Sequence, residues 1–522
     1  MNMFRTVRLA SAMAVIAFAI RAGGHAAASS PRVTTAQGEV QGKLISGGKV
    51  HAFLGLPYAA PPVGPLRWMP PQPPASWQQV RDATKFGSRC GQWQIWSDYL
   101  FLDPGPSEDC LYLNVYTPVA ADNSGRLPVM FWIHGGGYTA GAGSEPRYTN
   151  STLPLQGVVL VTINYRLGVF GFLASEDLAK EGGGSAGNYG LMDMVAALRW
   201  VRANIARFGG DPNNITIFGE SAGSFAVSTL MATPGARGLF QKAIGESGAA
   251  FSDVLPAGSL AARMRRDQEW VDSLGVRGLA EFRQMSTAEV IEGAQKKGVG
   301  WFTPVIDGSF LKQSIPETYA AGNQAHVPLL AGWNRDERAG TLSKGMTSKK
   351  WKAFAADHYG KRADEFLAAF QGRSDDEAIQ SADALTTAQF IALGTWRWIE
   401  AQVNTGAAPV YRYRFDLAAP PSEVHPEGKY AFHSDELEYV FGTLDTRHGA
   451  QWRPQDYVLS DEMTRYWANF ARAGDPNGEG LWHWPRYDNE KLVLHLDTKI
   501  TVTPDSTRPQ FEFLLQSARQ ER

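Results

Sequence analysis

Apolar residues along the chain form two kinds of pattern. Continuous apolar runs at 127–133 and 158–165 are typical of strands buried on both faces of a parallel sheet. Between the second run and a β-branched run at 215–218, apolar residues recur with helical period and fall on one face: Leu191, Met194, Val195, Leu198, Val201 and Ile205. The order strand, strand, helix, strand predicts an α/β fold with a doubly wound, mostly parallel sheet and helices on both faces.

Weaker patterns flank this centre. Alternation over 33–55 predicts short antiparallel strands, and the proline-dense segment 55–67 predicts an irregular surface loop. A further strand is expected from residue 111 to Pro118. Beyond residue 250 the chain is mostly helical, with helices predicted at 351–370 and 384–403 and strands at 327–331 and 410–414. Because no linker, repeat or charge run separates these parts, we predict one domain over 29–522.

The N-terminus has the pattern of a secretory signal peptide over 1–28. Arg5 and Arg8 precede an apolar run at 9–20, and small residues at 26–29 offer a cleavage site. The run of 12 residues is too short to span a bilayer; a buried N-terminal helix is the alternative. Since no later stretch is apolar over a spanning length, we expect a soluble protein exported to the periplasm or the medium.

Charge and cysteine content narrow the classes of partner. A net charge of −2 gives no reason to expect nucleic acid or an anionic membrane as partner, so a small molecule is favoured. In an exported chain, the only two cysteines, Cys90 and Cys110, are expected to form a disulfide; two free buried thiols are the alternative. No metal site is expected because two cysteines lack further ligands at zinc spacing, and nothing in the sequence indicates a cofactor or an oligomeric state.

The pentapeptide at 219–223, Gly-Glu-Ser-Ala-Gly, follows the run at 215–218 and precedes a segment that can continue as helix. G-x-S-x-G between a strand and a helix places the serine on a sharp turn with its hydroxyl exposed. Ser221 is therefore the candidate nucleophile, with a plain glycine-rich turn as the alternative. A similar segment at 245–249 has Ala249 in place of the second glycine, so we expect Ser247 to be structural.

A serine nucleophile needs a base and an acid, which follow it in the order acid, then histidine, on this kind of fold. His433 is favoured as base because it opens a polar loop before an amphipathic segment, and His425 in a proline-rich loop is its main rival. Asp336 and Glu337 follow the strand predicted at 327–331. Spacing does not choose between these two carboxylates.

The oxyanion formed during acyl transfer must be held by N–H donors. On this fold they come from the residue after the nucleophile, Ala222, and from a glycine-rich loop after an earlier strand. The loop at 135–137, Gly-Gly-Gly, follows the strand predicted at 127–133. A phosphate-binding loop is the alternative, but its terminal Gly-Lys-Ser/Thr is absent.

These motifs resemble those of the type-B carboxylesterases, the family of bacterial para-nitrobenzyl esterases and cholinesterases. Two long signatures carry the resemblance, at 208–223 and at 108–118, and further matches lie at 53–59, 474–477 and 484–485. The resemblance implies an α/β-hydrolase fold and a secreted, bacterial-type serine esterase. It also implies a triad of Ser221, Glu337 and His433, and an oxyanion hole formed by Gly136, Gly137 and Ala222. The resemblance supports the bridge between Cys90 and Cys110, and it places Glu220 near the histidine.

One position departs from the family pattern. Arg338 follows the acid where the family usually has glycine. The expected reaction is hydrolysis of a small-molecule ester through an acyl-enzyme, with a catalytically silent adhesion relative and an acyltransferase as alternatives. Aromatic residues of the loop between the cysteines either pack against the rest of the protein or cover a substrate cleft that favours bulky or aromatic esters. The residues assigned to this cleft are Trp93, Trp96 and Glu220.

Overall fold

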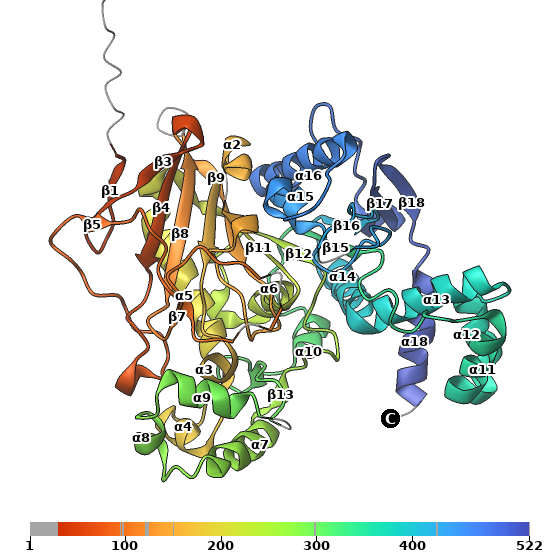
Figure 1. Cartoon of the computed structure of the whole chain (residues 1–522), viewed down its shortest axis with the longest axis horizontal. Coiled ribbons are helices and arrows are strands. Elements are labelled where there is room, and N and C mark those ends of the chain that lie inside the picture. Colours follow the sequence, from red (N-terminus) through yellow and green to blue (C-terminus); the bar gives the residue numbers. More distant parts are fainter. Residues whose placement is uncertain are drawn as a thin grey trace, which may run out of the picture.

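The computed structural model describes residues 30–93, 95–96, 99–120, 125–149, 151–296, 299–423 and 426–520. The segment predicted to be a signal peptide and His425 lie outside these residues. An eleven-stranded sheet runs through the molecule (Figure 1). Its strands, in spatial order, are β18 (Thr501–Pro504), β17 (Leu492–Leu496), β16 (Val410–Phe415), β15 (Leu329–Asn334), β12 (Lys242–Glu246), β11 (Gly210–Glu220), β9 (Leu127–Ile133), β10 (Val159–Ile163), β8 (Tyr112–Pro118), β4 (Val50–Pro57) and β3 (Lys43–Ile45).

The sheet is parallel in its centre and antiparallel at both edges. Every neighbouring pair from β10 through β17 is parallel, whereas β8, β4 and β3 at one edge and β18 at the other are antiparallel to their neighbours. The predicted mostly parallel α/β sheet is confirmed, as are the antiparallel strands predicted within 33–55. Short strands form three smaller sheets: β1 (Arg32–Thr34), β2 (Glu39–Gln41) and β5 (Arg81–Asp82); β6 (Arg89–Cys90) and β7 (Pro106–Ser107); and β13 (Gly258–Ser259) and β14 (Val305–Ile306).

Helices cover both faces of the sheet. The helix predicted at 188–207 is α5 (Tyr189–Asn204), which continues as a 3₁₀ turn. Apart from the four helices between residues 348 and 405, which are described next, the other helices are α2 (Thr152–Leu155), α3 (Gly168–Phe172), α4 (Glu176–Glu181), α6 (Ala222–Ala232), α7 (Leu260–Ser273), α8 (Leu279–Phe282), α9 (Thr287–Ala294), α10 (Ile315–Ala320), α15 (Leu437–Phe441), α16 (Pro454–Ala473), α17 (Tyr487–Glu490) and α18 (Arg508–Gln520).

Two long helices predicted in the C-terminal half are each interrupted. The segment 351–370 contains α11 (Ser348–Tyr359) and α12 (Ala363–Ala369), separated at Gly360, whose φ of 53° does not continue an α-helix. The segment 384–403 contains the end of α13 (Asp375–Thr387), a π-helical turn over 388–392, and α14 (Leu393–Thr405). The helical period of the apolar residues continues across both interruptions, so the sequence pattern alone did not predict the breaks.

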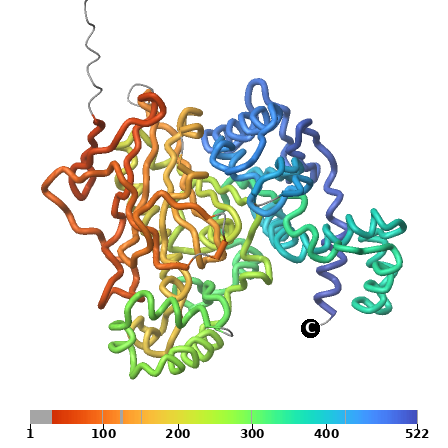
Figure 2. The backbone as a smooth tube through the Cα atoms, in the orientation of Figure 1, coloured from red at the N-terminus to blue at the C-terminus, as the bar shows by residue number. Residues whose placement is uncertain are grey.

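The core lies on both faces of the sheet because the central strands are buried on both sides. Successive residues of β9 alternate between two apolar clusters: Phe131 and Ile133 join one, and Met130 and Trp132 join the other. This alternation follows from the two-residue side-chain period of a strand. Figure 2 shows the red-to-yellow N-terminal half on one side of the molecule and the blue C-terminal part on the other, and the central strands connect the two.

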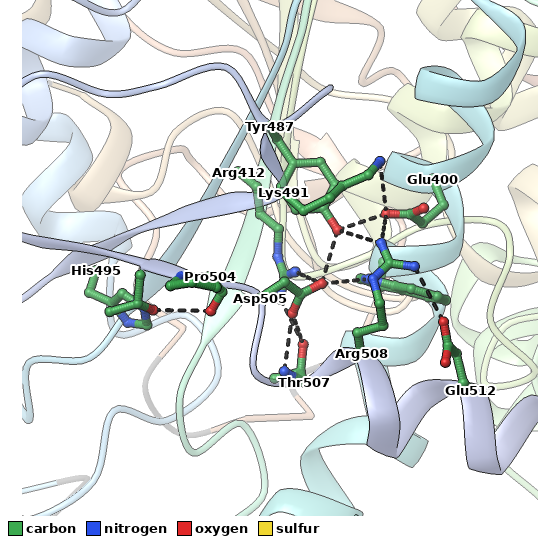
Figure 3. A network of polar contacts seen from close by, with 12 residues as sticks. Glu400, Arg412, Tyr487, Lys491, His495, Pro504, Asp505, Thr507, Arg508 and Glu512 are labelled. Atoms are coloured by element: carbon green, nitrogen blue, oxygen red, sulfur yellow. Dashed lines mark hydrogen bonds and ion pairs between the residues drawn. The ribbon is translucent and has the colours of Figure 1, made fainter. Parts of the chain in front are cut away.

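Two tertiary features fix loops and the C-terminus. Cys90 and Cys110 form the predicted disulfide, with their Cα atoms 4.8 Å apart. Near the C-terminus, a buried ion pair joins Arg412 of β16 to Asp505 at 2.5 Å, and Arg508 of α18 binds Glu400 of α14 at 2.7 Å (Figure 3).

Within the described parts of the chain, no helix is both long and apolar enough to cross a membrane.

Candidate active site

Ser221 occupies the turn between β11 and α6. Its backbone has φ 53° and ψ −124°, a conformation that residues with a Cβ rarely adopt. A close approach to β9 forces glycine on both sides of the serine: a Cβ added at Gly219 would lie 2.6 Å, and one at Gly223 2.0 Å, from the carbonyl oxygen of Ile133. The predicted strand, sharp turn and helix are therefore present, and the contact with β9 is the physical reason for the two glycines.

His433 and Glu337 extend a hydrogen-bonded chain from this serine. His433 Nε2 lies 2.9 Å from Ser221 Oγ, although 212 residues separate them in sequence. On the other side of the ring, His433 Nδ1 lies 2.7 Å from Glu337 Oε2. The second carboxylate oxygen of Glu337 accepts a hydrogen bond from the backbone N–H of Asn334 at 2.8 Å. Both carboxylate oxygens are thus held, which fixes the orientation of the imidazole.

The structure separates the two carboxylates that spacing left undecided. Asp336 accepts a hydrogen bond from the backbone N–H of Ala431 at 3.0 Å and pairs with Arg335 at 2.7 Å. It lines a different cavity, next to α13 and α18, while Glu337 turns inward to His433. Both residues lie in the turn that follows β15, and their separate hydrogen bonds hold the two side chains on different sides, so only Glu337 reaches the imidazole.

Glu220, beside the nucleophile, supplies a second carboxylate to His433. Its Oε1 lies 3.2 Å from His433 Nε2 and accepts a hydrogen bond from Ser434 Oγ at 2.8 Å. Burial raises the pKa of Glu220. Burial also opposes a charge on His433, but the charges of Glu220 and Glu337 outweigh it and raise the pKa of His433 to about 9. The site therefore stabilises an imidazolium strongly.

The glycine loop after β9 lies against the nucleophile. A Cβ added at Gly135 would lie 3.2 Å from the Cβ of Ser221. Gly136 and Gly137 have φ values of 97° and 60°, and their N–H groups donate no hydrogen bond to another described residue. Ala222 is the first residue of α6, so its N–H has no acceptor within the helix. The three predicted oxyanion donors thus come from two segments that flank the serine.

A cavity of about 770 Å³ opens above these groups. Trp96 and Glu220, both assigned to a cleft from the sequence, line it, but Trp93 is not among its described lining residues. The irregular loop between the cysteines thus presents some of its aromatic residues to this cavity, and the assignment of Trp93 to a substrate cleft stays a prediction. Side chains that sequence analysis did not place in the wall also line it: Tyr99, Phe225, Leu255, Arg263, Arg266, Trp301, Arg338 and Phe390.

Ser247 occupies a second strained turn, at the end of β12. It has φ 51°, resembling Ser221, but it is fully buried and is not among the lining residues of the cavity. Its Oγ has no hydrogen-bond partner in the described part of the chain. A substrate cannot reach a hydroxyl with no exposed surface, which agrees with the structural role expected from the sequence.

Comparisons with known proteins identify the family of the chain. The model of the Carboxylesterase family matches residues 29–514. The para-nitrobenzyl esterase of Bacillus subtilis is 39% identical over 494 residues, covering 91% of this chain and 96% of that protein. The fumonisin B1 esterase of Sphingopyxis macrogoltabida is 34% identical over 87% of this chain and 84% of its own length.

Solved structures give the same result. The crystal structure of a Geobacillus stearothermophilus carboxylesterase superposes with a TM-score of 0.78 at 34% identity, covering 92% of this chain and 99% of that one. A para-nitrobenzyl esterase structure covers the same share of this chain with a TM-score of 0.76. The chain therefore belongs to the carboxylesterase family of ester hydrolases and has the α/β-hydrolase fold.

Proposed function

We propose that the protein hydrolyses carboxylic esters through an acyl-enzyme, with Ser221 as nucleophile, His433 as general base and Glu337 as the group that orients the base. The observation that carries the proposal is the continuous chain from Ser221 Oγ through His433 to Glu337, with contacts of 2.9 and 2.7 Å. It lies where a substrate can enter, at the base of the cavity. A hydroxyl, an imidazole and a carboxylate in this arrangement can activate the serine.

The reaction has two halves. Ser221 Oγ attacks the ester carbonyl while His433 Nε2 takes its proton, and the C–O bond to the alcohol then breaks as the alcohol takes that proton from the imidazolium. Water then attacks the acyl carbon while His433 takes a proton from it. The bond between the acyl carbon and Ser221 Oγ breaks as Oγ takes that proton from the imidazolium, which releases the acid and restores Ser221. The oxyanion of both tetrahedral intermediates is placed to accept hydrogen bonds from the N–H groups of Gly136, Gly137 and Ala222.

The buried carboxylates assist this proton transfer. Glu337 fixes the tautomer, with the proton on Nδ1, which leaves Nε2 free to accept from the serine. Glu220 and Glu337 then stabilise the positive charge that appears on His433 in both halves of the reaction, in agreement with the raised pKa of that ring.

Aromatic side chains in the cavity support a preference for bulky or aromatic esters. Trp96, Tyr99, Trp301 and Phe390 supply flat apolar surface, which favours apolar groups by area burial and ring contacts. If Trp96→Ala leaves the ratio of kcat/KM for a benzoyl over an acetyl ester unchanged, Trp96 does not contribute to this preference.

The decisive experiment is turnover of para-nitrophenyl butyrate by the wild type and by Ser221→Ala. We expect the variant to lose at least about 10⁴-fold in kcat, and an organophosphate to label Ser221 and not Ser247. Wild-type turnover by Ser221→Ala, or a label on Ser247, would refute the assignment. No turnover of any short-chain ester by the wild type would favour the binding relative, and ester formation with added alcohols in place of acid would favour an acyltransferase.

We further propose that the protein is exported and acts in an oxidising compartment. The signal-like N-terminal sequence and the Cys90–Cys110 disulfide support this proposal. N-terminal sequencing of the protein recovered from the cell exterior or periplasm would test it, and recovery of the intact N-terminus from cytosol alone would refute it.

A further inference from the structure

Arg338 places a positive charge close to the candidate base. It directly follows Glu337, and its side chain lines the cavity. Its guanidinium carbon lies 4.1 Å from the centre of the Phe390 ring, and that ring contacts His433 edge-on with 5.0 Å between ring centres. Phe390 thus touches both groups, so Arg338 lies one aromatic side chain away from the imidazole.

The arginines of the cavity differ in their charged neighbours. Arg263 and Arg266 also line the cavity, but both lie beside Asp267, at 3.7 and 2.5 Å. The guanidinium of Arg338, by contrast, has no ion pair or hydrogen bond to any residue that the structure describes. Because one carboxylate faces two arginines on α7, that wall also carries an excess of positive charge.

The stacking on Phe390 makes Arg338 a prepared binding group. A guanidinium packed against a ring loses part of its conformational freedom before any ligand binds, and its planar set of N–H donors matches the geometry of a carboxylate. The carboxylates of the site, Glu220 and Glu337, are already engaged with Ser434, His433 and Asn334. Among the charged groups of the cavity, Arg338 is therefore well suited to bind an anion from solution.

We propose that Arg338 determines specificity by binding a carboxylate carried by the ester substrate, so that the enzyme prefers anionic esters, such as half-esters of dicarboxylic acids, over neutral esters of the same shape. This inference rests on the proposed ester hydrolysis and specifies its substrate class. The carboxylate is on the acyl part or on the alcohol part of the ester, and these two placements are separate arms of the test.

The test uses pairs of esters that differ only in charge. In the acyl arm, kcat/KM is measured for monoethyl glutarate and for ethyl glutaramate, its neutral amide. In the alcohol arm, 4-carboxybenzyl butyrate is compared with 4-carbamoylbenzyl butyrate. We expect the wild type to prefer the acid over the amide about five- to tenfold in one arm at low ionic strength, and salt to reduce the preference because Arg338 is exposed.

Variants assign the preference to one side chain. Arg338→Gln is expected to remove the preference, which is read as the ratio of kcat/KM for the acid to kcat/KM for its amide within one variant, so that an effect of the Arg338 charge on His433 cancels. Arg338→Lys is expected to retain part of the preference. Arg277→Gln removes one charge from an arginine whose side chain is 91% exposed and that does not line the cavity, so it should retain the full preference. Equal turnover of acid and amide by the wild type, or a preference that survives in Arg338→Gln, overturns the inference without affecting the proposed hydrolysis.

A binding measurement decides the inference even if no ester is turned over. Each acid is compared with its neutral amide for binding to Ser221→Ala: monoethyl glutarate with ethyl glutaramate, and 4-carboxybenzyl butyrate with 4-carbamoylbenzyl butyrate. In one pair the acid is expected to raise the Tm more than the amide does, and this difference is expected to disappear when Arg338→Gln is added. If acid and amide shift the Tm equally in both pairs, or if the difference persists without Arg338, the inference is wrong. Failure of hydrolysis alone would refute only the proposed function.

Discussion

Replacement of Glu220 by glutamine tests how the buried carboxylates tune the base. Glu220 Oε1 lies 3.2 Å from His433 Nε2, and the substitution removes its charge while it keeps the size of the side chain. His433 must be neutral to accept the serine proton, so kcat/KM rises with pH through the pKa of this ring. Removal of a negative neighbour lowers that pKa, and the rise should therefore move to lower pH.

The expected size of the shift follows from the geometry. Coulomb's law with an effective dielectric constant of about 20 gives about 5 kcal/mol for two unit charges 3.2 Å apart. This value is an upper bound because the His433 side chain is 24% exposed, so water in the cavity screens the interaction. We expect the pKa of His433 to fall by about one to two units, equivalent to about 1.4–2.7 kcal/mol. Maximal kcat should also fall, since the imidazolium loses a stabilising charge.

The assay is kcat/KM for a neutral para-nitrophenyl ester between pH 5 and 10, with correction for spontaneous hydrolysis. The matched control is Glu246→Gln. Glu246 is also a buried carboxylate, but it accepts a hydrogen bond from Trp467 and does not contact His433 among the described interactions. The charges that shift the pKa of His433 are those of Glu220, Glu337 and Arg338, so the substitution of Glu246 should shift the profile little. An acid limb that stays in place, or moves to higher pH, in Glu220→Gln would refute the electrostatic reasoning.

Three further predictions concern stability. Asp505→Asn leaves Arg412 buried without its partner and should cost about 3 kcal/mol. Burial opposes a charge on Asp505, but the charge of Arg412 outweighs it and lowers the pKa of Asp505. The stabilisation from this ion pair should therefore be full above about pH 4 and be lost as pH falls. Tm measured against pH for the wild type and for Asp505→Asn checks this, and parallel curves would contradict it. Gly223→Ala should abolish folding or activity, because the new Cβ would lie 2.0 Å from a carbonyl oxygen of β9; normal Tm and kcat would show that the turn adapts. Reduction of Cys90–Cys110, 20 residues apart, should destabilise the protein by about 3 kcal/mol in denaturant titrations, whereas an unchanged midpoint would assign the bond no such role.

Local sequence determined the elements that need only short-range information. The apolar run at 127–133 and the helical period of 188–207 specified β9 and α5 because strand and helix periods are local properties. The pentapeptide at 219–223 likewise specified a sharp turn, since its glycines and its flanking strand and helix lie within a few residues. The interruptions of the predicted C-terminal helices were missed, because the apolar period continues across them.

The partners of Ser221 required more than local pattern. Chain order limited the acid to Asp336 or Glu337, and only family resemblance chose between them before the structure showed which carboxylate contacts His433. The hydrogen bonds of Asp336 to Ala431 decide this choice, and they join segments 95 residues apart.

The sequence by itself thus determined the family, the sheet and the serine turn, since these depend on periodicity and on contiguous motifs. Tertiary structure decided the rest of the cavity wall beyond Trp96 and Glu220, where Trp301, Arg338 and Phe390 come from separate segments. It also decided which neighbours neutralise each charge. A charge in the sequence acquires a role only when folding fixes its distance to other charges, because electrostatic energy depends on that distance and on burial. For this reason Arg338 is only a departure from a pattern in the sequence, whereas in the folded protein it is a cation near the candidate base that forms no ion pair with a described residue.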